Sequence, residues 1–175
     1  MKVLLHSCCG PCASACIPRL RELGHEVTMF YANSNIDTAD EFEKRRAEAS
    51  KLAAADRVEM ACAPYDHAEW TREVAAGYEN ESEKGARCAR CFRYNLAKTA
   101  AYAREHGFDA FTTSLTVSPH KVSEMVFAAS DSPLFLKENF KKHDGFKRSL
   151  ARSAELGLYR QSYCGCEFSR RQNPA

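Results

Sequence analysis

The chain has 175 residues, of which 45% are hydrophobic and 27% are charged, and its formal net charge at pH 7 is +2. This length and this balance are ordinary for a globular protein, and we expect one domain over residues 1–175. The total charge argues neither for nor against nucleic-acid binding, whereas the lack of any apolar stretch near the roughly 20 residues that cross a bilayer argues against a membrane protein.

Segments predicted to contain strands and helices alternate along the first two-thirds of the chain. The strand segments are rich in apolar residues and cover residues 3–5, 25–35, 57–65 and 108–120. The helical segments are rich in strong helix formers and cover residues 13–23, 37–55, 67–78 and 85–107. The remainder, up to residue 159, is expected to be mixed helix and loop. This alternation predicts an α/β fold with a parallel sheet, whose ligands bind beyond the carboxyl ends of the strands.

The cysteines are the unusual feature of the sequence. The apolar run at the N-terminus covers about three residues, too few for the roughly 7–15 of a signal peptide, so we expect a cytoplasmic, reducing location. Structural disulfides are disfavoured there, and clustered cysteines more often bind metals or carry out redox chemistry. The nine cysteines are Cys8, Cys9, Cys12, Cys16, Cys62, Cys88, Cys91, Cys164 and Cys166.

Two of the cysteine pairs have the character of metal ligands. Cys8 and Cys9 follow the first predicted strand, and Cys88 and Cys91 form a CxxC motif near the start of a predicted helix. The i, i+3 spacing places both sulfurs of the second pair on one helix face. We expect the helix N-terminus and the flanking arginines to lower the pKa of these thiols. Four thiolates suit either zinc or an iron–sulfur cluster, and the spacing alone does not choose between them.

The remaining cysteines divide into candidate site residues and candidate core residues. Cys12 projects from the same turn as the first pair, and we expect it to be a metal ligand or a redox thiol. Cys164 and Cys166 form a CxC motif, in which a disulfide would be strained and easily reduced, so a redox pair is favoured over a second ligand pair. Cys16 and Cys62 are expected to lie in the core.

A few polar and aromatic residues are candidates for contacts with a substrate. His6 precedes the first cysteine cluster, where it either donates a proton or is a satisfied structural residue. Residues 31–36 can contact a ribose or a base, and residues 44–46 can contact phosphate, although a turn and a solvated helix face explain them equally well. Tyr159 and Tyr163 can stack on a base or pack on the core. Basic residues also gather late in the chain, where they can track phosphates.

Several motifs together resemble a known family. The segments that carry the resemblance occur in the order LLHSCCGPCAS, YANSNI, EFEKR, GARCARCF, GFDAFTTSLTVSPHK, GFKRS and LYRQSYCGC. Over nearly its whole length the chain is similar to epoxyqueuosine reductases of the QueH type, which do not use cobalamin. The resemblance implies an adenine-nucleotide-hydrolase-like (HUP or PP-loop-like) core with a helical C-terminal part. It implies reduction of epoxyqueuosine to queuosine at the wobble position of tRNAs with GUN-type anticodons, with an electron donor of unknown identity.

The resemblance also implies a set of site residues. Cys8, Cys9, Cys88 and Cys91 would hold a [4Fe–4S] cluster. The redox-active pair of the family would correspond to Cys164 and Cys166. Some members hold a second, mononuclear iron with a carboxylate at the position that Cys12 occupies here, so this chain departs from that pattern.

The chemistry of the implied reaction favours iron over zinc. Removal of an epoxide oxygen requires two electrons, which zinc cannot supply and which a cluster or a dithiol can. We therefore expect Cys164, Cys166, Cys12 and His6 to act in catalysis. Two other functions stay open on the residues alone, namely a zinc-stabilised RNA-binding module without catalysis and a thiol–disulfide oxidoreductase.

Overall fold

Four strands form one parallel sheet in the computed structural model, which describes residues 1–172. Their order across the sheet is β3-β2-β1-β4, and their bounds are Lys2–His6 (β1), Glu26–Tyr31 (β2), Glu59–Cys62 (β3) and Ala110–Thr113 (β4). The predicted α/β class and the parallel sheet are confirmed. The predicted domain end at residue 175 lies outside the described residues.

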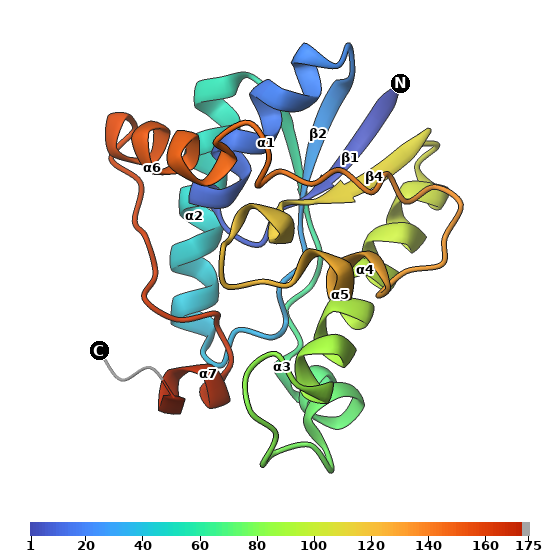
Figure 1. The fold of residues 1–175 in the computed structure, drawn as a ribbon, viewed down its shortest axis with the longest axis vertical. Coiled ribbons are helices and arrows are strands. Elements are labelled where there is room, and N and C mark those ends of the chain that lie inside the picture. Colours follow the sequence, from blue (N-terminus) through green and yellow to red (C-terminus); the bar gives the residue numbers. More distant parts are fainter. Residues whose placement is uncertain (173–175) are drawn as a thin grey trace.

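Helices cover both faces of this sheet (Figure 1). Three of them, α1, α2 and α6, stack along one side, and α4 and α5 lie on the other. The helix bounds are Gly10–Glu22 (α1), Ala39–Asp56 (α2), His67–Trp70 (α3), Ala86–Glu105 (α4), Ser123–Phe127 (α5), Gly145–Glu155 (α6) and Glu167–Gln172 (α7). A π-helical turn, η1 (Thr71–Ala75), follows α3, and a 3-10 turn, η2 (Ser114–Val117), follows β4.

The alternation of side chains along β1 divides the core into two layers. Val3 and Leu5 pack with α1 and α2, whereas Leu4 packs with α4, because successive side chains of a strand point to opposite faces. All three side chains are fully buried. A strand that is buried on both faces needs an unbroken apolar run rather than an alternating one, which explains the sequence of β1.

The register of the sheet brings the carboxyl ends of its strands to one edge. His6, the last residue of β1, is level with Phe30 of β2 and with Thr113 of β4. The loops that follow these strands therefore leave the sheet side by side, and the segments with the clustered cysteines follow β1 and flank this edge.

Several predicted boundaries were wrong by a few residues. The helix predicted over 13–23 begins at Gly10 and continues through Pro18. The strand predicted within 108–120 ends at Thr113, where the chain tightens into η2. The helix predicted over 67–78 changes to a π-helical turn and ends at Ala75. Propensity does not register such changes, because tertiary packing decides where each element ends. No helix in the described part of the chain is long and apolar enough to cross a membrane.

Candidate metal centre and active-site cavity

The turn between β1 and α1 presents the first cysteine cluster. Cys9 caps α1, and its sulfur accepts a hydrogen bond from the backbone N–H of Cys12 at 3.4 Å. Gly10 allows α1 to begin against α2, since a Cβ there would lie 2.8 Å from the carbonyl oxygen of Glu48. The glycine of the CCGPC motif is therefore required by the close approach of two helices, which fixes the direction of the cysteines on the turn.

Three sulfur atoms meet at this turn. The sulfurs of Cys8, Cys9 and Cys12 all lie within 4.8 Å of one another. Hydrogen bonds from Cys12 and Cys8 hold the pKa of Cys9 well below its ordinary value. Hydrogen bonds with Cys8 and Cys9, together with burial, raise the pKa of Cys12. The two neighbouring thiols thus favour the thiolate form of Cys9. Three sulfurs in tetrahedral contact with one ion would lie about 3.8 Å apart if each bond is about 2.3 Å, so the triad can bind a metal ion.

The second pair lies on the first turns of α4. The sulfur of Cys88 accepts a hydrogen bond from the backbone N–H of Lys84 at 3.3 Å. Burial raises the pKa of Cys88 and, further, that of Cys91. The expected net lowering of these values is wrong, because burial raises the pKa of Cys88 by more than the charge of Arg87 and the hydrogen bond from Lys84 lower it, and burial dominates at Cys91 as well. A metal would have to displace protons from these two thiols.

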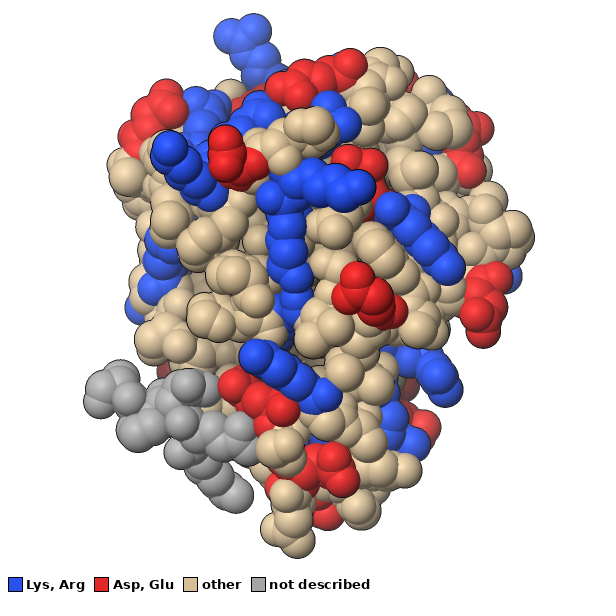
Figure 2. All heavy atoms as spheres, viewed as in Figure 1, with Lys and Arg blue, Asp and Glu red and all other residues tan. Residues whose placement is uncertain are grey.

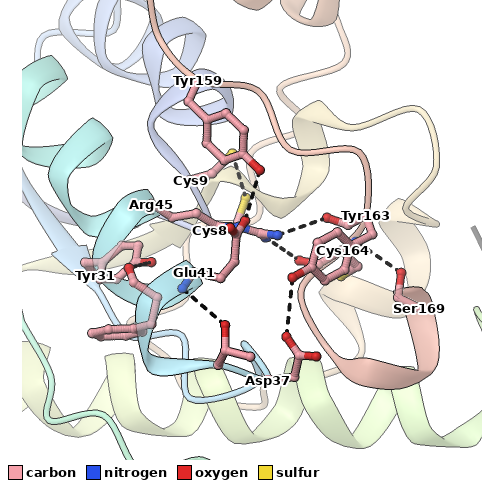
Figure 3. Close-up of polar contacts among 12 residues, drawn as sticks. Cys8, Cys9, Tyr31, Asp37, Glu41, Arg45, Tyr159, Tyr163, Cys164 and Ser169 are labelled. Atoms are coloured by element: carbon pink, nitrogen blue, oxygen red, sulfur yellow. Dashed lines mark hydrogen bonds and ion pairs between the residues drawn. The ribbon is translucent and has the colours of Figure 1, made fainter. Parts of the chain in front are cut away.

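The CGC segment, residues 164–166 before α7, is held by a network of buried contacts (Figure 3). Arg45 of α2 donates to the carbonyl oxygens of Cys164 at 2.8 Å and Tyr163 at 3.4 Å, and forms an ion pair with Glu41 at 2.6 Å. The backbone N–H of Asp37 donates to the carbonyl of the intervening glycine at 3.0 Å. The expectation that residues 44–46 contact phosphate is therefore wrong for Arg45, whose side chain is 1% exposed.

One cavity of about 480 Å³ joins these segments. Its wall includes cysteines from the β1–α1 turn, from α4 and from the CGC segment, namely Cys8, Cys12, Cys88, Cys91 and Cys164. A small adjoining pocket is lined by Cys166 together with Cys88, Cys91 and Cys164. Cys9 lies behind Cys8, with 4.0 Å between their sulfurs. Chain segments that are remote in sequence thus direct their thiols at one space.

The chain is similar to known proteins over nearly its whole length. The family model described as epoxyqueuosine reductase QueH matches residues 3–172. The chain belongs to this family. Among its relatives named epoxyqueuosine reductase QueH, that of Acinetobacter baylyi is 37% identical over 97% of this chain and 81% of its own. That of Streptococcus pyogenes is 36% identical over 95% and 69%, and that of Thermotoga maritima is 33% identical over 95% and 89%.

His6 of this QueH family member lies at the sheet edge but not on the cavity wall. Its Nε2 donates to the carbonyl of Ala32 at 3.2 Å, and its Nδ1 accepts from the hydroxyl of Thr113 at 2.8 Å. Burial lowers its pKa to about 4, against which the bond to Ala32 acts. The ring is therefore a neutral link between strands, and both of its nitrogens are engaged by Ala32 and Thr113 rather than by the cavity.

The two cysteines expected in the core have different environments. Cys16, a residue of α1, is fully buried, as predicted. Cys62 is exposed at the end of β3, so the prediction for it was wrong. β3 is an edge strand with one neighbour, and its last residue has no layer above it to cover the side chain.

Sequence reasoning missed the most direct partner of the CGC segment. The ammonium of Lys121 lies 2.7 Å from the sulfur of Cys164, and both residues line the cavity. A lysine in a loop belongs to no helical or strand periodicity. Its position in the loop after a predicted strand was therefore the one feature of the sequence that pointed to the cavity. Asn33 and Asn35 of the YANSNI segment also line the cavity, as does Tyr163, whereas Tyr159 does not appear on its wall.

Proposed function

We propose that this protein reduces the epoxide of epoxyqueuosine in tRNA to the alkene of queuosine. Its relatives are named epoxyqueuosine reductases, which supports this proposal. The observation that carries the proposal is the single cavity on which thiols from remote segments converge. Its volume of about 480 Å³ lies within the range of small-molecule sites. The family match over residues 3–172 supports one functional domain over residues 1–175, and a tRNA substrate supports a cytoplasmic location.

The donor set fits an iron–sulfur cluster. We assign Cys8, Cys9, Cys88 and Cys91 as the ligands of a [4Fe–4S] centre, because thiolate is the ligand that such clusters take and because these sulfurs lie on or next to one cavity wall. When bound, the cluster would transfer electrons one at a time. The protein's contribution is to hold the four sulfurs on two segments, the turn between β1 and α1 and the start of α4.

The triad of Cys8, Cys9 and Cys12 supports a second, mononuclear metal. A thiol at position 12 in place of a carboxylate makes the donor set softer, which favours iron or zinc over magnesium. Cys12 is the residue whose removal separates the two sites, because it is not among the proposed cluster ligands.

The cavity wall can receive a flipped wobble nucleotide. Asn33 and Asn35 offer amide groups to a ribose or a base, and the ring of Tyr163 offers a stacking surface. Enzymes that act on a base take it out of the stack, which this cavity requires because its thiols lie below the surface. A tRNA with epoxyqueuosine at the wobble position of a GUN-type anticodon is the substrate that fits this proposal.

The backbone of the tRNA needs a basic surface, which the sequence suggested late in the chain. Several of those arginines are instead paired with acids from other segments, since Arg148 contacts Glu22 at 2.9 Å and Arg152 contacts Asp56 at 2.8 Å. Figure 2 shows basic and acidic side chains interleaved over this face, with a short line of basic side chains across its middle. Contact with phosphate is therefore proposed to be local to the cavity mouth, where Arg160 and Lys84 lie.

The electron balance assigns a role to the CGC segment. The reaction breaks both C–O bonds of the epoxide, forms the alkene and releases the oxygen as water, which takes two electrons and two protons. Oxidation of the Cys164–Cys166 pair to a disulfide supplies the two electrons, solvent supplies the protons that the pair does not carry, and an external donor then restores the reduced pair. Of the other two residues expected to act in catalysis, Cys12 lines the cavity, whereas His6, the expected proton donor, lies behind its wall.

The most informative test combines metal analysis with analysis of tRNA. Protein prepared without oxygen is analysed for iron, sulfide and zinc, and nucleosides are measured in tRNA from a deletion strain with and without the gene. Iron, sulfide and restored queuosine are expected. One zinc with no iron or sulfide would indicate an RNA-binding module instead, and reduction of a protein disulfide by the metal-free chain would indicate a thiol–disulfide oxidoreductase.

The cluster assignment predicts the effect of a single substitution. Cys88→Ala removes one of four ligands, and anaerobic reconstitution should restore less than about one-tenth of the brown visible absorbance of the wild type. Cys62→Ala is the matched control, because Cys62 is exposed at the end of β3. This variant should leave the absorbance unchanged. Full absorbance in the Cys88 variant would remove Cys88 from the ligand set.

A further inference from the structure

A lysine ammonium contacts the CGC segment inside the cavity. The Nζ of Lys121 donates to the sulfur of Cys164 at 2.7 Å, and the lysine side chain passes over the ring of Phe92, with 5.5 Å from Nζ to the ring centroid. Lys121 also lines the small adjoining pocket with Cys166. Within the described residues, no other side-chain cation donates a hydrogen bond to a cysteine sulfur, so this contact is specific to one thiol.

The backbone on both sides of this contact is fixed. The N–H of Lys121 donates to the carbonyl of Ser118 at 3.2 Å, and its own carbonyl accepts from the ammonium of Lys141. On the other side, the carbonyl of Cys164 accepts from Arg45 at 2.8 Å. Two segments that lie 43 residues apart are therefore each anchored beside the contact, which lowers the entropic cost of holding the ammonium at the sulfur.

The charge environment keeps this lysine protonated. Burial lowers the pKa of Lys121, but the charge of Cys164 and the hydrogen bond to its sulfur raise it by more, with smaller contributions from Cys88 and Cys91. The net direction is upward from an ordinary value that is already above 10. The side chain thus supplies a fixed positive charge to the cavity over the whole working range of pH.

We propose that Lys121 is a positioning residue that stabilises the sulfur of Cys164 as a thiolate and thereby favours the dithiol form of the Cys164–Cys166 pair. This inference rests on the redox role proposed above for that pair. A dithiol reductant breaks the Cys164–Cys166 bond and becomes a disulfide itself. The two electrons that it delivers convert the pair into one thiolate, on Cys164 next to the ammonium, and one thiol, on Cys166. One proton of the reductant is released to solvent.

The expected consequence is a shift of the redox equilibrium of the pair. The disulfide carries no charge for Lys121 to stabilise, whereas the reduced pair carries a thiolate, so the ammonium acts on one state only. Stabilisation of the reduced form is what makes a dithiol pair more oxidising. Loss of the ammonium should therefore shift the equilibrium with a reference dithiol about tenfold toward the disulfide, which is about 30 mV for a two-electron couple.

The test is a redox titration of the full-length protein with its metal centre reconstituted without oxygen. Mixtures of oxidised and reduced dithiothreitol set the potential, and differential alkylation with mass spectrometry counts the free thiols of Cys164 and Cys166. Lys121→Met should show the tenfold shift, and Lys121→Arg, which keeps the charge, should stay within about threefold of the wild type. Lys84→Met is the matched control, because Lys84 lines the same cavity but is exposed, and it should shift the equilibrium less than twofold.

The outcomes separate this inference from the function on which it rests. A wild-type pair that forms no disulfide at any ratio would overturn the redox pair and this inference together. A pair that titrates normally but is unmoved in Lys121→Met, or is moved equally by Lys84→Met, would overturn only the role of Lys121. Because Lys121→Met can perturb the loop, Lys121→Gln serves as a second uncharged variant, and the shift must appear in both.

Discussion

At the scale of single residues, buried charge decides where the CGC segment lies. Arg45 follows three acidic residues in a helix rich in charged residues, and the sequence pattern alone makes it a solvated side chain. In the structure it is buried, and its guanidinium joins Glu41 to the carbonyls of Tyr163 and Cys164 (Figure 3). Its neighbour Arg46 forms an ion pair with Glu43 but is 41% exposed. The two adjacent arginines therefore have very different energetic roles.

This difference predicts a matched pair of stability effects. Arg45→Met should lower the free energy of unfolding by about 3–5 kcal/mol, because it leaves the Glu41 carboxylate and two carbonyls without their buried partner. Arg46→Met should lower it by less than about 1 kcal/mol, because solvent screens the exposed pair. Urea unfolding at pH 7 measures both values. Equal losses in the two variants would contradict the role assigned to Arg45.

At the scale of elements, one histidine links the ends of three chain segments. His6 ends β1, accepts a hydrogen bond from Thr113 at the end of β4 and donates to Ala32, directly after β2. A carbonyl oxygen can only accept, so Nε2 carries the proton and Nδ1 is the acceptor in the neutral ring. These hydrogen bonds hold the edge of the sheet from which the cysteine-bearing turn departs. The contribution of His6 to the free energy of unfolding depends on the ring staying neutral.

The neutral ring predicts a pH dependence of stability. The pKa of His6 falls from its ordinary value near 6.5 to about 4 in the folded chain, so the unfolded chain binds more protons between these values. Its stabilising contribution is complete above pH 6.5 and is lost as the pH falls toward 4, by about 3 kcal/mol. His6→Asn should therefore show a flatter decline of unfolding free energy than the wild type over this range.

Urea unfolding at several pH values between 7 and 4 measures this decline. His106→Asn is the control, because His106 is exposed at the end of α4 and should follow the wild-type curve. If the His6 variant follows that curve as well, the ring titrates in the folded state near its ordinary pKa, and the neutral link between the strands is wrong.

At the scale of the whole molecule, the cavity is where remote segments depend on one another. The turn after β1, the start of α4 and the CGC segment contribute thiols to its wall, and no backbone ladder joins these segments directly. A metal centre held by both of the first two segments would link them only in the folded chain. Binding to the folded state alone raises its stability by mass action.

We therefore expect the reconstituted protein to unfold at a temperature several degrees above that of the metal-free chain, and the gap to widen from pH 6.5 to pH 8.5. The sign follows from the thiols, because burial raises the pKa of Cys88 and Cys91 and protons compete more strongly with metal as the pH falls. Anaerobic calorimetry measures the gap. Cys91→Ser should abolish it and Cys62→Ser should keep it, and a gap that survives in Cys91→Ser would contradict the proposed link.

The sequence by itself determined the class of fold and the family of this protein. The alternation of apolar segments with helix formers predicts a parallel sheet, because a helix between two strands allows them to pair in parallel. The unbroken apolar run of β1 predicts that this strand is buried on both faces. The CC, RCxxCF and YCGC motifs together identified the family, because each combines residue types that are rare side by side.

Only the tertiary structure decided which side chains meet. The contact of Lys121 with Cys164 and the clamp of Arg45 on the CGC segment join residues 43 and 119 positions apart, and no local periodicity encodes such pairs. Burial likewise reversed the expected pKa shift of Cys88 and Cys91. The position of Cys62 at the end of an edge strand left its side chain exposed. The physical reason is the same in each case: desolvation and ion pairing depend on what the folded chain packs around a residue, which its neighbours in sequence do not specify.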